Sequence, residues 1–327
     1  MKKFTVVLLA VLLVFSFSAC NVSPSGGSSQ ENADKLRIVT TIFPQYDFAR
    51  QITGGKAELT MLLQPGVESH GYEPSPKDII KIQQSDIFIY VGGESDKWVD
   101  EVLSSLDTEN MRIIKLMDCV NTLEEEHVEG MDEGHEDEAD GYEYDEHVWT
   151  SPGNAIKITE KISEAVCEAD KDNASYYKEN TESYLKKLKE LDNSFTQAVK
   201  EAKRHIMVFG DRFPFRYFTD AYGLTYYAAF PGCSSETEPS AATLKFLIDK
   251  VKDEKIPCIF YIEMSDQKVA DTICEATGAK KLLFHSCHNV TKEEFESGVT
   301  YLSLMQNNYK NLLSALNCFF VESLSIF

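Results

Sequence analysis

The sequence predicts an α/β fold of two βα lobes, each with a mainly parallel sheet, joined by one long rigid helix with a ligand cleft between the lobes. Two observations predict it. Short apolar runs alternate with helix-length segments in both halves of the chain, which is typical of βα units. Between the halves, residues 173–205 contain no Pro or Gly and keep apolar side chains at helical spacing. A chain of 327 residues has room for two such lobes.

The N-terminal lobe is expected over residues 36–172. Four short apolar runs predict its strands, at 36–40, 59–63, 87–91 and 113–116. The segments between these runs are long enough for the helices that parallel strands need as crossovers. Ligands of open parallel sheets bind outside the carboxyl ends of the strands, so the loops that follow these strands are the first places to search for binding residues.

The linking helix is expected over residues 173–205. Its apolar side chains recur at helical spacing, at Tyr177, Tyr184, Leu188, Leu191, Phe195 and Val199. At 1.5 Å per residue such a helix is roughly 45 Å long. A rigid connection of this length permits less lobe movement than flexible strands would.

The C-terminal lobe is expected over residues 206–327 and repeats the pattern of the first. Its strands are predicted at 206–209, 225–229, 258–262 and 281–284, with helices near 240–254, 265–277 and 293–315. The cleft is expected where the loops of the two lobes face each other.

The first twenty residues have the pattern of an export signal. Lys2 and Lys3 precede an apolar stretch that ends in Ser18-Ala19-Cys20. A cysteine at this place resembles the bacterial lipobox, in which the thiol is acylated, although Phe17 stands where leucine is usual. The alternative is an ordinary cleaved signal with an incidental cysteine. Residues 21–35 are rich in small polar residues and are expected to form a flexible tether.

The charge of the chain argues against nucleic acid as a partner. The formal net charge is -21, from 53 acidic and 32 basic residues, and a cation is the more natural ligand. Much of this charge lies in an acidic loop, residues 124–146, which also carries His127 and His135. The loop either gathers metal ions transiently or is simply a solvated run of charge.

Two further segments place a histidine beside the expected cleft. Residues 65–76 read PGVESHGYEPSP and follow a predicted strand, so the turn favoured by Pro65 and Gly66 puts His70 on a loop at a strand end. Residues 144–155 read YDEHVWTSPGNA and carry His147 just before the next predicted helix. A single loop histidine is more often an ordinary surface residue, and the metal interpretation depends on the pair.

Together these segments resemble the paired signatures P-G-x-x-x-H-x-Y-E-P-S-P and D-x-H-x-W-x-x-P of the substrate-binding lipoproteins of zinc and manganese ABC importers. The resemblance extends from about Leu36 to Leu316 and includes the long helix and the acidic loop. It implies that His70 and His147 are metal ligands from the N-terminal lobe. It also implies a protein, lipid-anchored to the cell membrane, that captures a divalent metal ion outside the cytoplasm and delivers it to an ABC permease.

The resemblance leaves the ligands of the C-terminal lobe open. The family places a ligand after the first strand of this lobe, where this chain has Arg212, and arginine cannot coordinate a metal. The neighbouring Asp211 is the expected oxygen donor, with a structural role as the alternative. The family's last ligand, usually a carboxylate, falls at or beside Ser286, and His285 is the expected substitute, with His288 as second choice.

Two more carboxylates remain as reserve donors. Glu236 and Glu238 lie on another loop expected to face the cleft. Each is equally explained as a carboxylate near the start of a helix, where the helix dipole favours negative charge.

The expected ligands favour zinc, because neutral imidazoles suit Zn²⁺ whereas Mn²⁺, the alternative, prefers more carboxylate oxygens. We expect a monomer and no enzymatic activity. A zinc-dependent hydrolase is the enzymatic alternative, but the sequence contains no HExxH, nucleophile-elbow or P-loop motif. A surface adhesion protein is the third interpretation, and it predicts no metal requirement.

Overall fold

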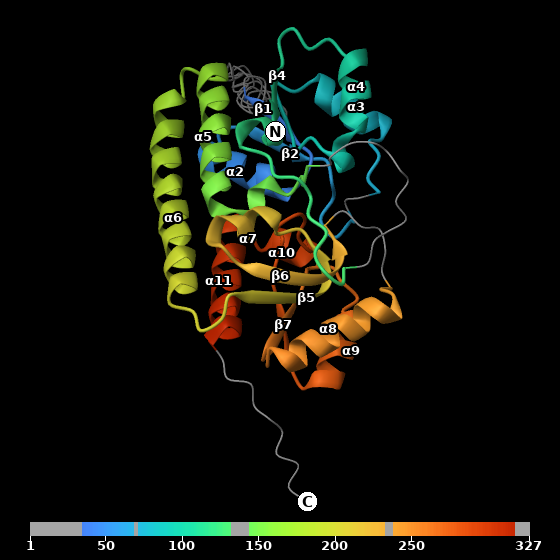
Figure 1. Ribbon diagram of the computed structural model, residues 1–327. Coiled ribbons are helices and arrows are strands. Elements are labelled where there is room, and N and C mark those ends of the chain that lie inside the picture. The colour runs from blue at the N-terminus through green and yellow to red at the C-terminus, as the bar shows by residue number, and fades with distance from the viewer. Residues whose placement is uncertain (1–34, 69–70, 132–143, 233–237, 318–327) are drawn as a thin grey trace, which may run out of the picture. The chain divides into compact units, whose positions relative to one another are not determined.

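The computed structural model describes residues 35–68, 71–131, 144–232 and 238–317 (Figure 1). Both lobes belong to one compact unit that begins at Leu36. The predicted architecture is confirmed: each lobe has a four-stranded parallel sheet, and one long helix connects the lobes. No helix among the described residues is both long and apolar enough to cross a bilayer.

The sheet of the N-terminal lobe has the strand order β2-β1-β3-β4. Its strands are β1 (Arg37–Thr40), β2 (Glu58–Met61), β3 (Ile87–Tyr90) and β4 (Arg112–Lys115). The helices of this lobe are α2 (Phe43–Thr53), α3 (Pro76–Gln83), α4 (Trp98–Ser105) and α5 (Pro152–Ala169). All four residues of β3 are buried, as expected for an apolar strand inside a sheet that is covered on both faces.

The sheet of the C-terminal lobe repeats this order as β6-β5-β7-β8. Its strands are β5 (Ile206–Phe213), β6 (Thr225–Pro231), β7 (Cys258–Tyr261) and β8 (Lys280–Leu283). Its helices are α7 (Arg216–Tyr222), α8 (Ala241–Asp253), α9 (Lys268–Thr277), α10 (Lys292–Glu296) and α11 (Tyr301–Asn317). Gly210 lets α9 approach β5 closely, because a Cβ atom there would lie 2.6 Å from the Cα atom of Ala270.

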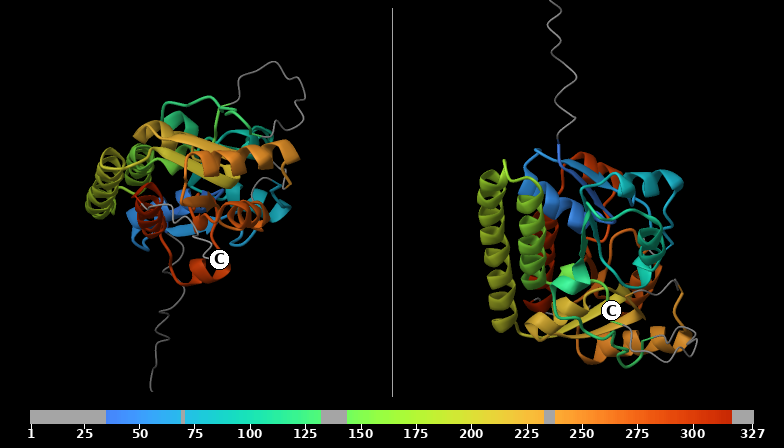
Figure 2. Two further views of the ribbon diagram at one scale, coloured as in Figure 1. Left: turned by 60° about the horizontal axis from the view of Figure 1, so that its bottom comes forward. Right: turned by 90° about the horizontal axis from the view of Figure 1, so that it is seen from above.

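The linking helix is α6 (Ala174–Lys200), which runs beside α5 along one side of both sheets (Figures 1 and 2). It packs against α2 and α5 of the first lobe and against α7 and α11 of the second. All six apolar side chains that predict the helix are buried. The helix ends five residues before the predicted end, where the carbonyl of Val199 accepts from the amide of Ala202 and contacts the ring of His205.

Two further predicted helices differ from the observed ones. The helix predicted at 293–315 is divided into α10 and α11, since Gly298 has φ +77° and interrupts the helical backbone. The helix predicted at 265–277 begins only at Lys268, because Gln267 adopts φ +62°. Both breaks shorten helices without moving a strand.

Candidate metal site

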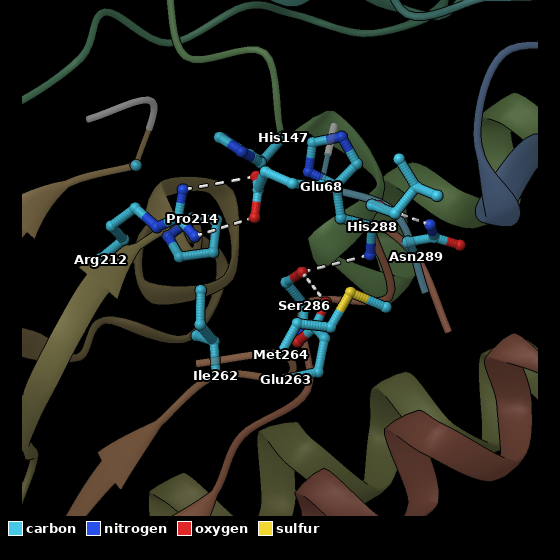
Figure 3. A pocket seen from close by; sticks show the side chains of 12 residues that line it. Glu68, His147, Arg212, Pro214, Ile262, Glu263, Met264, Ser286, His288 and Asn289 are labelled. Carbon is cyan, nitrogen blue, oxygen red and sulfur yellow. Dashed lines mark hydrogen bonds and ion pairs between the residues drawn. The ribbon is translucent and has the colours of Figure 1, made fainter. Parts of the chain in front are cut away.

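The structure places a small cavity of about 30 Å³ between the two lobes (Figure 3). The N-terminal lobe supplies Val67, Glu68 and His147 to its lining. The other lining residues belong to the C-terminal lobe: Arg212, Pro214, Gly232, Ile262, Glu263, Met264, Ser286, His288 and Asn289. Most of them follow the carboxyl ends of strands, as the topology predicts.

His147 lies fully buried in the turn that precedes α5. Its Nδ1 atom is 3.2 Å from a carboxylate oxygen of Asp145, which also accepts from the His147 backbone amide at 2.8 Å. Burial lowers the pKa of His147, but the carboxylates of Asp145, Glu146 and Glu125 outweigh burial and raise it above its usual value. A carboxylate on one ring nitrogen directs the other nitrogen toward a metal, as in many histidine metal sites.

Hydrogen bonds with the C-terminal lobe hold the segment around His147. The indole of Trp149 donates to the carbonyl of Ser286 at 2.8 Å, and the hydroxyl of Tyr301 donates to the carbonyl of Trp149 at 2.8 Å. The hydroxyl of Tyr217 donates to the carbonyl of Asp145 at 2.7 Å. The position of the His147 ring is therefore fixed by both lobes.

His288 follows β8 and brings a second imidazole to the cavity. Its ring centroid lies 5.6 Å from that of His147 and 5.1 Å from that of Trp149. Two imidazoles that bind one tetrahedral zinc at about 2.0–2.1 Å have ring centroids about 5 Å apart. The separation of the two rings is thus compatible with one shared ion.

His285, the predicted substitute ligand, is buried but does not line this cavity. Its Nδ1 atom accepts from the backbone amide of Cys287 at 2.9 Å, and its backbone is hydrogen-bonded to the side chain of Asn308 through both amide and carbonyl. The backbone of Cys287 has φ +63°, so the chain reverses between the two histidines. These contacts give His285 a role in shaping the loop that carries His288.

Asp211, the predicted oxygen donor, is also buried away from the cavity lining. Its carboxylate accepts from the backbone amides of Arg212 at 2.9 Å and Ile262 at 3.3 Å. Burial raises the pKa of Asp211, and hydrogen bonds from Ser265 and the two amides oppose this effect. Through these contacts Asp211 connects the ends of β5 and β7.

Arg212 and Glu68 meet across the cavity. The two terminal nitrogens of Arg212 lie 3.5 and 3.3 Å from the two carboxylate oxygens of Glu68. From the sequence, Arg212 was expected to be unable to coordinate a metal and, as one alternative, to pair with Asp211, whereas Glu68 and Glu263 were not predicted as site residues. The signals that would have found the two glutamates are their positions, two residues before His70 and directly after a predicted strand.

Only two of the remaining predicted residues lie in the part of the chain that the structure describes. These two, His127 and Glu238, are exposed and do not line the cavity. His70, His135, Glu236 and Cys20 lie outside the described residues. Within the described ranges, no three His, Cys, Asp or Glu side chains are already grouped to hold a metal ion.

Comparisons with known proteins agree with this architecture. Residues 38–315 match the family described as ZnuA, zinc-uptake complex component A, periplasmic. The chain is 35% identical over 313 residues to the zinc-binding lipoprotein AdcA of Streptococcus pneumoniae, covering 95% of this chain but only 60% of AdcA. It is 31% identical to the high-affinity zinc uptake system protein ZnuA of Bacillus subtilis, covering 96% of this chain and 98% of that protein.

A solved structure is similar as well. The Zn(II)-bound ZnuA-like domain of Streptococcus pneumoniae AdcA superposes with a TM-score of 0.71 at 33% identity, covering 87% of this chain and 100% of that domain. The match therefore includes both lobes and not only the sequence motifs.

Proposed function

The chain belongs to the ZnuA family of zinc-uptake components, and from that premise we propose that it captures a divalent transition metal outside the cytoplasm and delivers it to an ABC-type importer. Zinc is the favoured ion and manganese the alternative. The relatives are named for zinc binding and zinc uptake, which supports a binding role and not catalysis.

The observation that carries this proposal is the pair of imidazoles from different lobes at one cavity. His147 and His288 have ring centroids 5.6 Å apart, and a capture site needs ligands from both lobes. His70 is the proposed third imidazole, since Glu68 lines the cavity two residues before it. The contacts of His285 and Asp211 favour structural roles for both, so His288 is the proposed C-terminal ligand.

Zinc titration of the mature protein tests the proposal. We expect one tight zinc site per chain, together with weaker binding through the acidic loop. Removing both N-terminal imidazoles, in a His70→Ala, His147→Ala double variant, should abolish the tight site. The matched control is His205→Ala, because His205 is exposed just before β5 and does not line the cavity. Full zinc affinity in the double variant contradicts the proposal.

The metal preference has its own test. A site of three imidazoles should bind Zn²⁺ more tightly than Mn²⁺, because Mn²⁺ favours oxygen ligands and stands lower in the Irving–Williams order. Competition between the two ions for the purified protein measures this preference directly. Tighter binding of Mn²⁺ would reverse the assignment.

We also propose that Cys20 carries the lipid that anchors the protein and that the monomer docks on a permease. The name of AdcA as a lipoprotein supports the anchor. Expression of a Cys20→Ser variant in a bacterial host that processes lipoproteins tests it, and the variant should be released from the membrane fraction. Retention equal to that of the wild type contradicts the anchor without affecting the metal site.

A further inference from the structure

The cavity is lined by a positively charged side chain at a place where a metal-capture site requires an atom that can coordinate the ion. Arg212 lines the cavity, its side chain is 19% exposed, and it occupies the position at which related proteins are expected to place a ligand. A closed zinc site needs four donors, and a guanidinium can supply none. Another side chain or a solvent molecule must therefore complete the site.

Among the described residues, only two carboxylates line the cavity, Glu68 and Glu263. Glu263 is already engaged, because one of its oxygens accepts from the backbone amide of Ser286 at 2.7 Å and the other from the Ser286 hydroxyl. The same hydroxyl accepts from the amide of His288 at 3.1 Å. Glu263 thus orients the loop that carries His288, and any movement of its side chain would disturb those contacts.

The side chain of Glu68 is far more exposed than that of Glu263. Its side chain is 53% exposed and contacts Arg212 through both carboxylate oxygens, at 3.3 and 3.5 Å. Figure 3 shows the Glu68 side chain extending between the guanidinium of Arg212 and the ring of His288, with His147 beside them. An exposed side chain is free to rotate, so one oxygen can turn toward the imidazoles while the other keeps its contact with Arg212.

We infer that Glu68 supplies the carboxylate oxygen of the metal site and that Arg212 is the positioning residue that holds its second oxygen. This inference rests on the proposed function. It explains why a positively charged arginine is tolerated beside a metal site. The carboxylate of Glu68 balances the charge of Arg212, and the planar guanidinium can contact both carboxylate oxygens. The donor that is missing from the C-terminal lobe is thereby replaced from the loop of the other lobe.

The test measures the affinity of the mature protein for Zn²⁺ alone, in competition with a chromophoric chelator, and the zinc coordination shell by X-ray absorption. Glu68→Gln should weaken zinc binding by at least about tenfold, the lower range seen when a group that supports a metal site is lost. The carboxylate oxygen should also disappear from the shell. Glu73→Gln is the control, because Glu73 is an exposed glutamate in the same loop that does not line the cavity.

The role of Arg212 is tested by a double-mutant cycle. Arg212→Met should weaken zinc binding when Glu68 is present and should no longer weaken it when Glu68→Gln is already in place. A purely structural role would weaken binding equally in both backgrounds and would overturn the positioning role.

The outcomes separate this inference from the proposed function. The ligand role of Glu68 is overturned if Glu68→Gln binds zinc with an affinity within twofold of both wild type and Glu73→Gln. It is also overturned if the carboxylate signal is unchanged in that variant. Wild-type protein that binds zinc no better than His147→Ala overturns the proposed function itself.

Discussion

Two histidines three residues apart have opposite surroundings in this protein. His288 lines the cavity, whereas the ring of His285 accepts from the amide of Cys287 and lies outside the cavity lining. The sequence alone favours His285, because it is nearer the end of the predicted strand. It cannot reveal the reversal at Cys287, since positive φ at a residue other than glycine leaves no dependable trace in sequence.

Alanine substitutions should separate the two roles. His288→Ala is expected to lose most of the zinc affinity with little change in stability. His285→Ala should cost about 1–3 kcal/mol of unfolding free energy, because a buried backbone amide loses its acceptor. Zinc titration and urea denaturation of both variants check this, and the reverse pattern would show that His285 is the ligand, as the sequence predicts.

The same limit applies to Asp211 and Arg212. The register between β5 and β6 shifts between Phe209 and Arg212. Strict alternation along a strand cannot anticipate such an irregularity, which changes the direction of the following side chains. The place of His147 at the cavity was predictable from its motif, but which side chains of the C-terminal lobe reach the cavity depends on local backbone geometry.

At the level of elements, the parallel strands were the most predictable feature. Each of the eight predicted strands overlaps an observed one, because strands of parallel sheets in α/β folds are short apolar runs. The helix ends were less predictable, since a single positive φ at Gln267 or Gly298 decides them.

The short helix at Glu94–Asp96 buries a carboxylate whose charge opposes folding. Asp96 accepts from the amides of Val91 at 2.7 Å and Gly92 at 3.1 Å, yet burial dominates and raises its pKa from 3.8 to about 6. The folded protein therefore holds a proton that the unfolded chain releases. Asp96 destabilises the fold increasingly as the pH rises from about 4 to 6, by about 3 kcal/mol once it is ionised.

Asp96→Asn should remove this penalty and keep an oxygen acceptor for both amides. We expect the variant to gain stability relative to wild type as the pH rises through this window, with the difference constant above it. Urea denaturation at several pH values measures the gain. A difference that does not change with pH would show that Asp96 ionises normally in the folded protein.

The loop that follows β2 is attached to the other lobe by Asn289. The side-chain amide of Asn289 donates to the carbonyls of Gln64 at 2.8 Å and Val67 at 2.9 Å, and the amide of Gly66 donates to the carbonyl of Val290 at 2.8 Å. These contacts fix the start of the segment that leads to His70.

Asn289→Ala should destabilise the protein by about 1–3 kcal/mol, as expected for the loss of two partly buried hydrogen bonds. It should also weaken zinc binding, because the loop loses its attachment beside the cavity. Thermal unfolding and zinc titration test both effects, and unchanged zinc affinity would show that the attachment serves stability alone.

On the scale of the whole molecule, the charge is distributed unevenly. The net charge of -21 includes the dense acidic loop at residues 124–146, which we propose gathers zinc near the cavity. Deleting residues 132–143 should leave the tight site intact and remove the weaker zinc binding. Uptake at limiting zinc should fall in cells that carry the deletion. Unchanged uptake would indicate that the loop is only a solvated run of charged residues.

The two ends of this loop are held together by the side chain of Tyr217 and by one backbone hydrogen bond. The hydroxyl of Tyr217 accepts from the amide of Leu123 at 3.1 Å and donates to the carbonyl of Asp145, while the amide of Asp145 donates to the carbonyl of Leu123 at 2.9 Å. The two ends of the loop are thus joined to each other before the chain reaches His147. This closure holds the path of the chain into His147, and Met131 is buried in the core, so only changes within residues 132–143 should leave the zinc affinity unaltered, which zinc titration of such a variant measures.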